Sequence, residues 1–180
     1  MKFLIVMAIL LLSGCVDNSY SYYSDPVSHY TNEIRNRVAV QLRDEMQLYP
    51  SCTGGEGLYN IRMLALFFSY YEEVDIEKAR ELIVKAGILF LKTANEDEKA
   101  RPYLANYPFG LKNIELRFFM KTKNGPETRP DKLSCISLIE GKIEYETFPG
   151  MKGFITIHEE TFAEAAAKLK IQLTPETGLE

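Results

Sequence analysis

Few side chains in this sequence have the chemistry of a nucleophile or a metal ligand. The candidates are Cys15, Cys52, Cys135, His29 and His158. A thiol beside an imidazole can be deprotonated, so either of the last two cysteines paired with a histidine would make a hydrolase site. No cysteine-protease signature surrounds them, and His158 lacks the second histidine one helical turn away that a shared metal requires. The sequence therefore assigns no catalytic residue, no metal ligand and no cofactor, and an envelope hydrolase is kept as an alternative.

A glycine-rich segment offers a second kind of chemistry. Gly54, Gly55 and Gly57 surround Glu56, and backbone amides in such a segment can hold a phosphate. The spaced glycines and the Lys-Ser/Thr pair of a P-loop are missing, so a loop before a helix is the expected structure. Because Cys52 and Glu56 lie close to that expected helix start, this segment is the first place to look for a site.

Carboxylates supply the third candidate chemistry. Glu115, Glu144 and Glu146 alternate with apolar residues and could pair across strands, as the two carboxyl groups of a glycosidase do. The solvent-facing side of a sheet explains the same alternation. A paired-carboxylate hydrolase therefore stands beside the Cys/His hydrolase as an alternative.

Three helices are expected before any strand. The first begins at Asp25-Pro26 and ends before Pro50, because Tyr30, Ile34, Val38, Leu42 and Met46 recur every four residues. The second covers 58–72, is apolar nearly all round and is expected at the centre of the fold. The third covers 75–93, with Asp75 as its N-cap.

The period then changes to two, which predicts strands over 114–121, 133–139, 142–148 and 153–158. The turn at Glu140-Gly141 places Leu138 opposite Ile143 and Ile136 opposite Tyr145, with Cys135 on the other sheet face. Ile155 and Ile157 are expected to point inward. A capping box from Thr161 to Glu164 predicts a last helix reaching about Lys170. The fold class is therefore α+β: three N-terminal helices, a four-stranded antiparallel meander and one C-terminal helix.

The connector between the third helix and the first strand is rich in aromatic residues. Tyr103, Tyr107 and Phe109 would form a recognition patch if they were exposed, because aromatic side chains anchor many interfaces. The alternative is that they cover the edge of the core.

The N-terminus has the layout of a secretory signal. Met1-Lys2 precede an apolar run over 3–12, which is shorter than the roughly 20 residues of a membrane-spanning helix. The following Leu12-Ser13-Gly14-Cys15 resembles the lipobox of bacterial lipoproteins. The resemblance covers only the leader. It implies that residues 1–14 are a signal peptide cleaved before Cys15, whose thiol carries acyl chains such as palmitate.

The same resemblance suggests where in the cell the protein is located. Residues 15–25 would then be a lipid anchor and tether, 26–173 a single α+β domain, and 174–180 a frayed tail. Val16 follows the cysteine, whereas lipoproteins kept in the inner membrane of double-membrane bacteria have Asp there. The outer membrane is therefore favoured if the host has one. With Cys15 lipidated, Cys52 and Cys135 remain as a disulfide candidate in an oxidising periplasm, or as two separate reduced thiols.

The composition of the chain limits which classes of partner are expected. The chain has 21 basic and 25 acidic residues and a net charge of −4, which makes nucleic acid a poor partner. A hydrophobic content of 46% is enough for a packed core. We therefore expect an envelope lipoprotein, tethered to the membrane by its lipid, whose domain binds a protein partner without catalysis. A structural envelope component is a further alternative.

Overall fold

A computed structural model describes residues 25–122 and 131–174 of the 180-residue chain. The predicted signal peptide, the predicted lipid attachment at Cys15, the predicted tether up to residue 24 and the predicted tail from residue 175 onward lie outside the described residues. Within the described ranges, no helix combines the length and the apolar character that a membrane crossing needs.

Six strands form one mixed sheet in chain order. The elements are α1 (Pro26–Met46), β1 (Tyr49–Glu56), β2 (Met63–Tyr70), α2 (Ile76–Asn95), η1 (Arg101–Tyr103), η2 (Leu111–Asn113), β3 (Ile114–Met120), β4 (Leu133–Ile139), β5 (Lys142–Thr147), β6 (Ile155–Thr161) and α3 (Phe162–Lys168). β2 and β3 are parallel and are joined by a crossover through α2, whereas all other neighbouring strands are antiparallel. The two short 3-10 turns, η1 and η2, lie in the connector after α2.

The predicted architecture of three N-terminal helices and a four-stranded antiparallel meander is wrong. The helix expected over 58–72 is β2, and the loop expected before it is β1, so the sheet has six strands. A short apolar run has no period that separates a buried helix from a buried strand. Most residues of β2 are buried, because β1 and β3 flank the strand at its two edges and α1 packs on one of its faces. β1 tolerates Pro50 because it is an edge strand and has an irregular register there.

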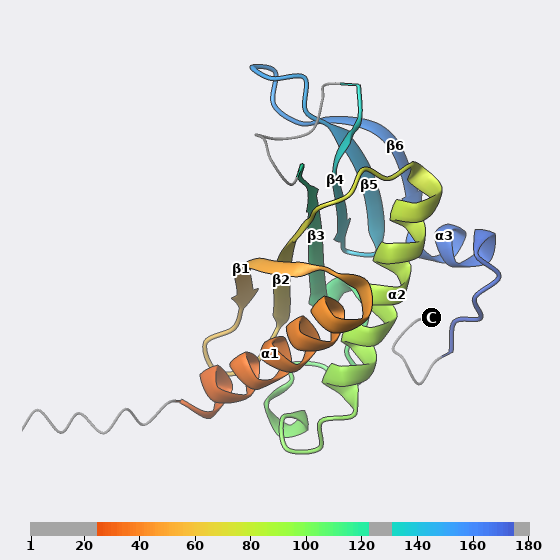
Figure 1. The fold of residues 1–180 in the computed structure, drawn as a ribbon. Helices are drawn as coiled ribbons and strands as arrows, with labels where there is room; N and C mark the ends of the chain where they lie inside the picture. The colour runs from red at the N-terminus through yellow and green to blue at the C-terminus, as the bar shows by residue number, and fades with distance from the viewer. Residues whose placement is uncertain (1–24, 123–130, 175–180) are drawn as a thin grey trace, which may run out of the picture.

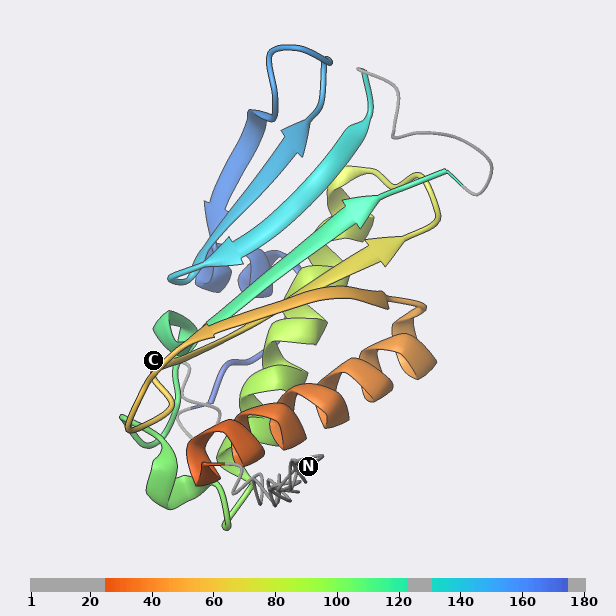
Figure 2. The same cartoon turned by 90° about the vertical axis from the view of Figure 1, so that its left-hand side faces the viewer.

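The helices lie together on one face of the sheet, as Figure 1 and Figure 2 show. α1 begins where expected because Asp25 caps it and Pro26 fits its first turn. Its buried stripe of Ile34, Val38 and Leu42 packs on β1 and β2, and α2 packs on β3 and β4. The other face of the sheet carries no helix among the described residues.

The strands with period two form largely as predicted. Leu138 pairs with Ile143 and Ile136 with Tyr145 across the Glu140-Gly141 turn. The prediction that Ile155 and Ile157 point inward is wrong, because both are about half exposed on β6. The register of β5 and β6 shifts between Tyr145 and Glu146, which leaves other β6 residues facing the helices.

One of those inward residues, Glu160, is a buried carboxylate that joins three elements. It accepts hydrogen bonds of 2.6 Å from Arg80 Nε on α2, Tyr145 Oη on β5 and Lys168 Nζ on α3. Burial raises the pKa of Glu160, but the hydrogen bonds from Lys168, Tyr145 and Arg80 outweigh that effect and lower it overall. The network fastens α2 and α3 to the far edge of the sheet.

We predict that Glu160→Gln destabilises the fold by about 3–5 kcal/mol, because the buried Arg80 guanidinium loses its anionic partner. Urea unfolding of the full chain measures this difference. Glu159→Gln is the matched control, since Glu159 is exposed and its change leaves the network intact. Equal stability of the two variants would show that the network contributes nothing.

The same carboxylate gives a pH dependence. Because its folded-state pKa lies below the ordinary value of 4.5, its stabilisation is present above that pH. It is lost as the pH falls from 4.5 through the lower folded-state pKa. Unfolding of Glu160→Gln at a series of pH values is expected to lack this component.

Candidate functional site

Arg35 on α1 has no anionic partner among the residues that the structure describes. It follows the buried Ile34 and reaches toward the β1–β2 connection, where its Nε is buried and has no hydrogen-bond partner within the described ranges. Burial lowers the pKa of its guanidinium. An arginine nevertheless stays charged in proteins, so this is a partly desolvated positive charge without compensation. Buried polar groups normally have partners, and an exception requires an explanation.

Glycines let the hairpin backbone approach this guanidinium. A Cβ at Gly55 would lie 2.5 Å from Arg35 Nη2 and 2.8 Å from the carbonyl oxygen of Met63. Gly57 adopts a φ of +145°, and a Cβ there would lie 1.9 Å from the carbonyl oxygen of Asn60. The glycine-rich segment therefore forms the end of a tight hairpin, and not the loop before a helix that the sequence suggested.

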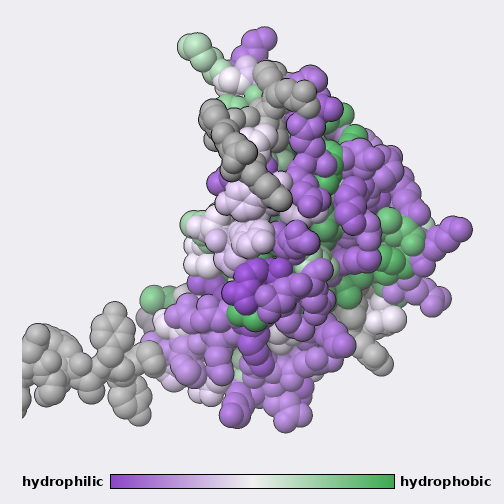
Figure 3. Space-filling view, in the orientation of Figure 1, coloured by the Kyte–Doolittle hydropathy of each residue, from purple (hydrophilic) through white to green (hydrophobic). Residues whose placement is uncertain are grey.

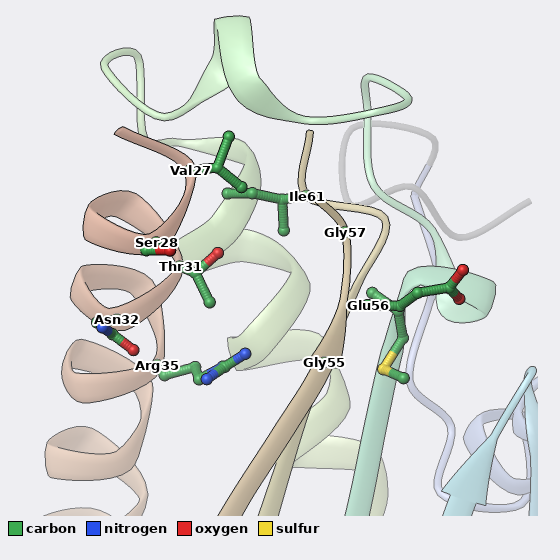
Figure 4. Close-up of a pocket in the computed structure, with 10 residues that line it drawn as sticks. Val27, Ser28, Thr31, Asn32, Arg35, Gly55, Glu56, Gly57 and Ile61 are labelled. Atoms are coloured by element: carbon green, nitrogen blue, oxygen red, sulfur yellow. The ribbon is translucent and has the colours of Figure 1, made fainter. Parts of the chain in front are cut away.

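A cavity of about 200 Å³ lies between α1 and this hairpin. Figure 4 shows Arg35 extending from the helix toward Gly55, and Val27 and Ile61 lying against each other at one end. The polar α1 residues Ser28, Thr31 and Asn32 also line the cavity, and Thr31 points toward the hairpin. The walls therefore combine one guanidinium with hydroxyl and amide groups.

The acidic residue in the cavity wall does not neutralise Arg35. The carboxylate of Glu56 points away from α1 in Figure 4, and one of its oxygens lies 3.5 Å from Arg62 Nη1. A guanidinium has five N–H donors in a planar fork that fits two oxygens of one anion. Cavities for drug-sized ligands measure about 300–1,000 Å³, so this one fits a single anionic group of a ligand.

Cations that line another groove have partners. This groove, of about 770 Å³, runs between α1 and α2. In it, Arg37 pairs with Asp97 and Lys85 with Glu81. The Glu160 network likewise gives Arg80 a carboxylate. Arg35 differs from these groups because it is partly buried and no described residue supplies a counter-charge.

The disulfide considered for Cys52 and Cys135 is not found in this fold, which has the alternative of two separate thiols. Cys52 is exposed on β1 and Cys135 is buried on β4, and both are free. β2 and β3 lie between them, so three strand spacings of about 4.8 Å separate their backbones. A disulfide requires Cα atoms within about 7 Å.

The thiols also lack the features of a Cys/His site. Burial raises the pKa of the Cys135 thiol, and the Glu146 carboxylate adds to the shift. Such a thiol stays protonated and is a poor nucleophile. In the described part of the chain, no hydrogen bond joins either cysteine to His29 or His158. No cluster of His, Cys, Asp or Glu that could hold a metal is found among these residues either.

The predicted aromatic patch does not form. Phe109 is fully buried, and its backbone N–H and carbonyl are both hydrogen-bonded to the Asn95 side chain. Tyr103 stacks on Tyr30 of α1 at 4.9 Å between ring centroids, and Tyr107 is half exposed beneath the guanidinium of Arg101. Phe109 and Tyr103 therefore fasten the connector to the core, and Tyr107 is the one of the three that is exposed.

The carboxylates on the helix-free face are arranged as solvated surface charges. Glu115 lies 2.9 Å from Arg117, and Lys142 lies 3.0 Å from Glu144 and 2.7 Å from Glu159. Glu115 and Glu144 therefore each have a cation as a partner. Glycoside hydrolysis instead uses two carboxyl groups that act as a pair without such compensation.

Sequence reasoning found the glycine segment but missed Arg35. The signal that could have found it is the polar series Ser28, Thr31, Asn32 and Arg35, whose spacing of three, four and seven residues places them on one side of a helix. Comparison of the chain with protein-family models, with curated proteins and with solved structures finds no match.

We predict that Gly55→Ala destabilises the protein by about 1–3 kcal/mol, because the new Cβ meets both the Arg35 guanidinium and the Met63 carbonyl. Gly54→Ala is the control, since a Cβ at that position would be 3.4 Å from the Cβ of Ala65, an ordinary contact. Urea unfolding of both variants measures the difference. If both lose the same stability, the close approach of hairpin and guanidinium is not what requires the glycine.

Proposed function

We propose that this chain is a lipid-anchored binding protein of the bacterial cell envelope, and that its domain holds a small anionic group of its ligand against Arg35. The observation that carries the proposal is the partly buried guanidinium of Arg35, whose buried Nε has no hydrogen-bond partner among the described residues and which lies at the wall of a small cavity. The domain acts by binding and leaves the ligand chemically unchanged.

The energetics of the guanidinium support an anionic ligand. A charge taken from water without a partner is costly, and a protein retains such a charge where something compensates it. Charge-assisted hydrogen bonds from a guanidinium to oxygens are among the stronger polar contacts, at about 1.5–3 kcal/mol. An anion between Arg35 and the hydroxyl of Thr31 would satisfy both groups.

The leader sequence supports attachment of the protein to a membrane. The apolar run over 3–12 and the tetrapeptide Leu12-Ser13-Gly14-Cys15 stand directly before the tether, and two or more acyl chains hold a protein firmly to a bilayer. Val16 favours the outer membrane in a double-membrane host. On this proposal, the partners of the protein are the membrane and the carrier of the anionic group.

The first test is anion binding. Inorganic phosphate titrated into the full chain in neutral detergent is expected to bind, and Arg35→Gln is expected to weaken the affinity by about tenfold or more. Isothermal titration calorimetry measures both affinities. Arg43→Gln is the matched control, because it removes an exposed arginine from the same helix whose partner is the neighbouring Asp44.

Equal phosphate affinity of Arg35→Gln and the parent chain would overturn the site. Failure of the parent chain to bind phosphate, sulfate or acetate would overturn the assignment of an anionic ligand.

The second test concerns the anchor. The chain isolated from native membranes is expected to begin at Cys15 and to be heavier by its acyl groups, whereas Cys15→Ser is expected to appear without acyl mass in the soluble fraction. Intact-mass spectrometry of both fractions measures this. Cys52→Ser changes an exposed thiol and serves as the control that keeps its lipid. An uncleaved or unlipidated parent chain would refute the anchor.

A further inference from the structure

We propose that the membrane itself supplies the anionic group: the end of the domain that carries the tether docks on the lipid surface, and Arg35 binds the phosphate of a phospholipid whose headgroup has a net negative charge. This inference rests on the proposed function, because it names the carrier of the anion that the Arg35 cavity holds. It adds an interaction surface that the lipid anchor by itself does not require.

The cavity lies at the end of the domain where the tether begins. The start of α1, the β1–β2 turn and the connector after α2 gather there in both ribbon views (Figures 1 and 2). Backbone hydrogen bonds hold this end together, from Ile61 N–H to the Tyr103 carbonyl at 2.7 Å and from Ala105 N–H to the Ile61 carbonyl at 2.8 Å. The cavity therefore lies on a surface whose segments are joined by backbone hydrogen bonds.

The length of the tether limits how far this surface can lie from the bilayer. Asp25, the first described residue, caps α1, and the cavity lining begins two residues later at Val27. Ten residues separate Cys15 from Asp25, and an extended chain spans at most about 3.6 Å per residue, so roughly 36 Å is the longest separation available. That reach is comparable to the size of the domain itself.

The turn beside the cavity exposes residues that suit a lipid interface. Leu58 is 74% exposed and Tyr59 is 87% exposed, and they follow directly after Gly57 of the cavity wall. Among the large apolar residues of the described ranges, only Met151 is more exposed, and it lies at the opposite end of the sheet. A tyrosine combines an apolar ring with a polar hydroxyl, which suits the boundary between headgroups and acyl chains.

Because the chain has a net negative charge, a general electrostatic attraction does not explain docking on an acidic membrane. The net charge of the chain is −4, and the face seen in Figure 3 is largely hydrophilic, so neither the overall charge nor this face provides a general attraction to an acidic membrane. We therefore assign recognition of an anionic lipid to a specific site. Arg35 provides one that lies next to the apolar turn, so the turn can enter the interface while a phosphate enters the cavity.

The absence of tryptophan from the sequence gives a clean test. Tyr59→Trp introduces a single fluorescent reporter at the proposed contact, and Tyr71→Trp places a matched reporter beyond the opposite end of β2, where Tyr71 is 38% exposed. Each full-length lipidated variant is reconstituted into vesicles with brominated acyl chains, composed of phosphatidylcholine alone or of an equimolar mixture with phosphatidylglycerol.

The proposal expects a blue-shifted emission and several-fold stronger bromine quenching at position 59 than at position 71. Quenching at position 59 is expected to increase with phosphatidylglycerol and to return to the phosphatidylcholine level when Arg35→Gln is added or when inorganic phosphate competes. Arg43→Gln is expected to leave the quenching unchanged.

The other outcomes separate this inference from the proposed function. Phosphate binding through Arg35 without quenching at position 59 would overturn the membrane docking and leave a soluble anion as the ligand. Quenching that is independent of lipid composition and of Arg35 would overturn headgroup recognition. Absence of both phosphate binding and quenching would overturn the inference together with the anion site beneath it.

Discussion

The burial of β2 between two neighbouring strands is the constraint on which the rest of this structure depends. β2 pairs with β1 on one side and, in parallel, with β3 on the other. Parallel neighbours need a crossover, which α2 provides, and the crossover helix must lie on a face of the sheet. α1 covers the part of that face which α2 leaves open, and it contacts both β1 and β2. The hairpin that joins β1 to β2 is thereby held against α1, where the glycine backbone meets Arg35.

Arg80, which is buried, and Arg35, which is partly buried, show how the same chemical group can have different roles. Arg80 donates to Glu160, which also accepts from Tyr145 and Lys168, so its charge is compensated within the protein and fastens α2 to β6. Arg35 lies in a comparable position between a helix and the sheet, yet nothing in the described ranges compensates its charge. The first arrangement contributes to stability, whereas on the proposed function the second is available to a ligand. This difference in compensation is our reason for proposing a binding role for Arg35 and a structural one for Arg80.

The position of the site fits a domain that works at a surface. The cavity, the exposed Leu58-Tyr59 turn and the start of the tether all belong to one end of the molecule, and the β5–β6 hairpin lies at the other. A tethered protein presents one end to the membrane more often than the other, because its anchor restricts how far that end can move away. Binding near the anchor then benefits from a high effective concentration of lipid headgroups. On the proposed function, a single arginine is therefore sufficient for recognition.

The sequence by itself determined the features whose patterns are local. Asp25, Asp75 and Thr161 marked the starts of the three helices, and residue alternation predicted β3, β4 and β5 with the register of the hairpin at Glu140-Gly141. The tertiary structure decided everything that depends on distant neighbours. It made the apolar run at Met63–Tyr70 a strand, buried Phe109, separated Cys52 from Cys135 and left Arg35 without a counter-charge. The physical reason is that capping and periodicity act within a few residues, whereas burial, pairing and charge compensation depend on contacts between segments far apart in the chain.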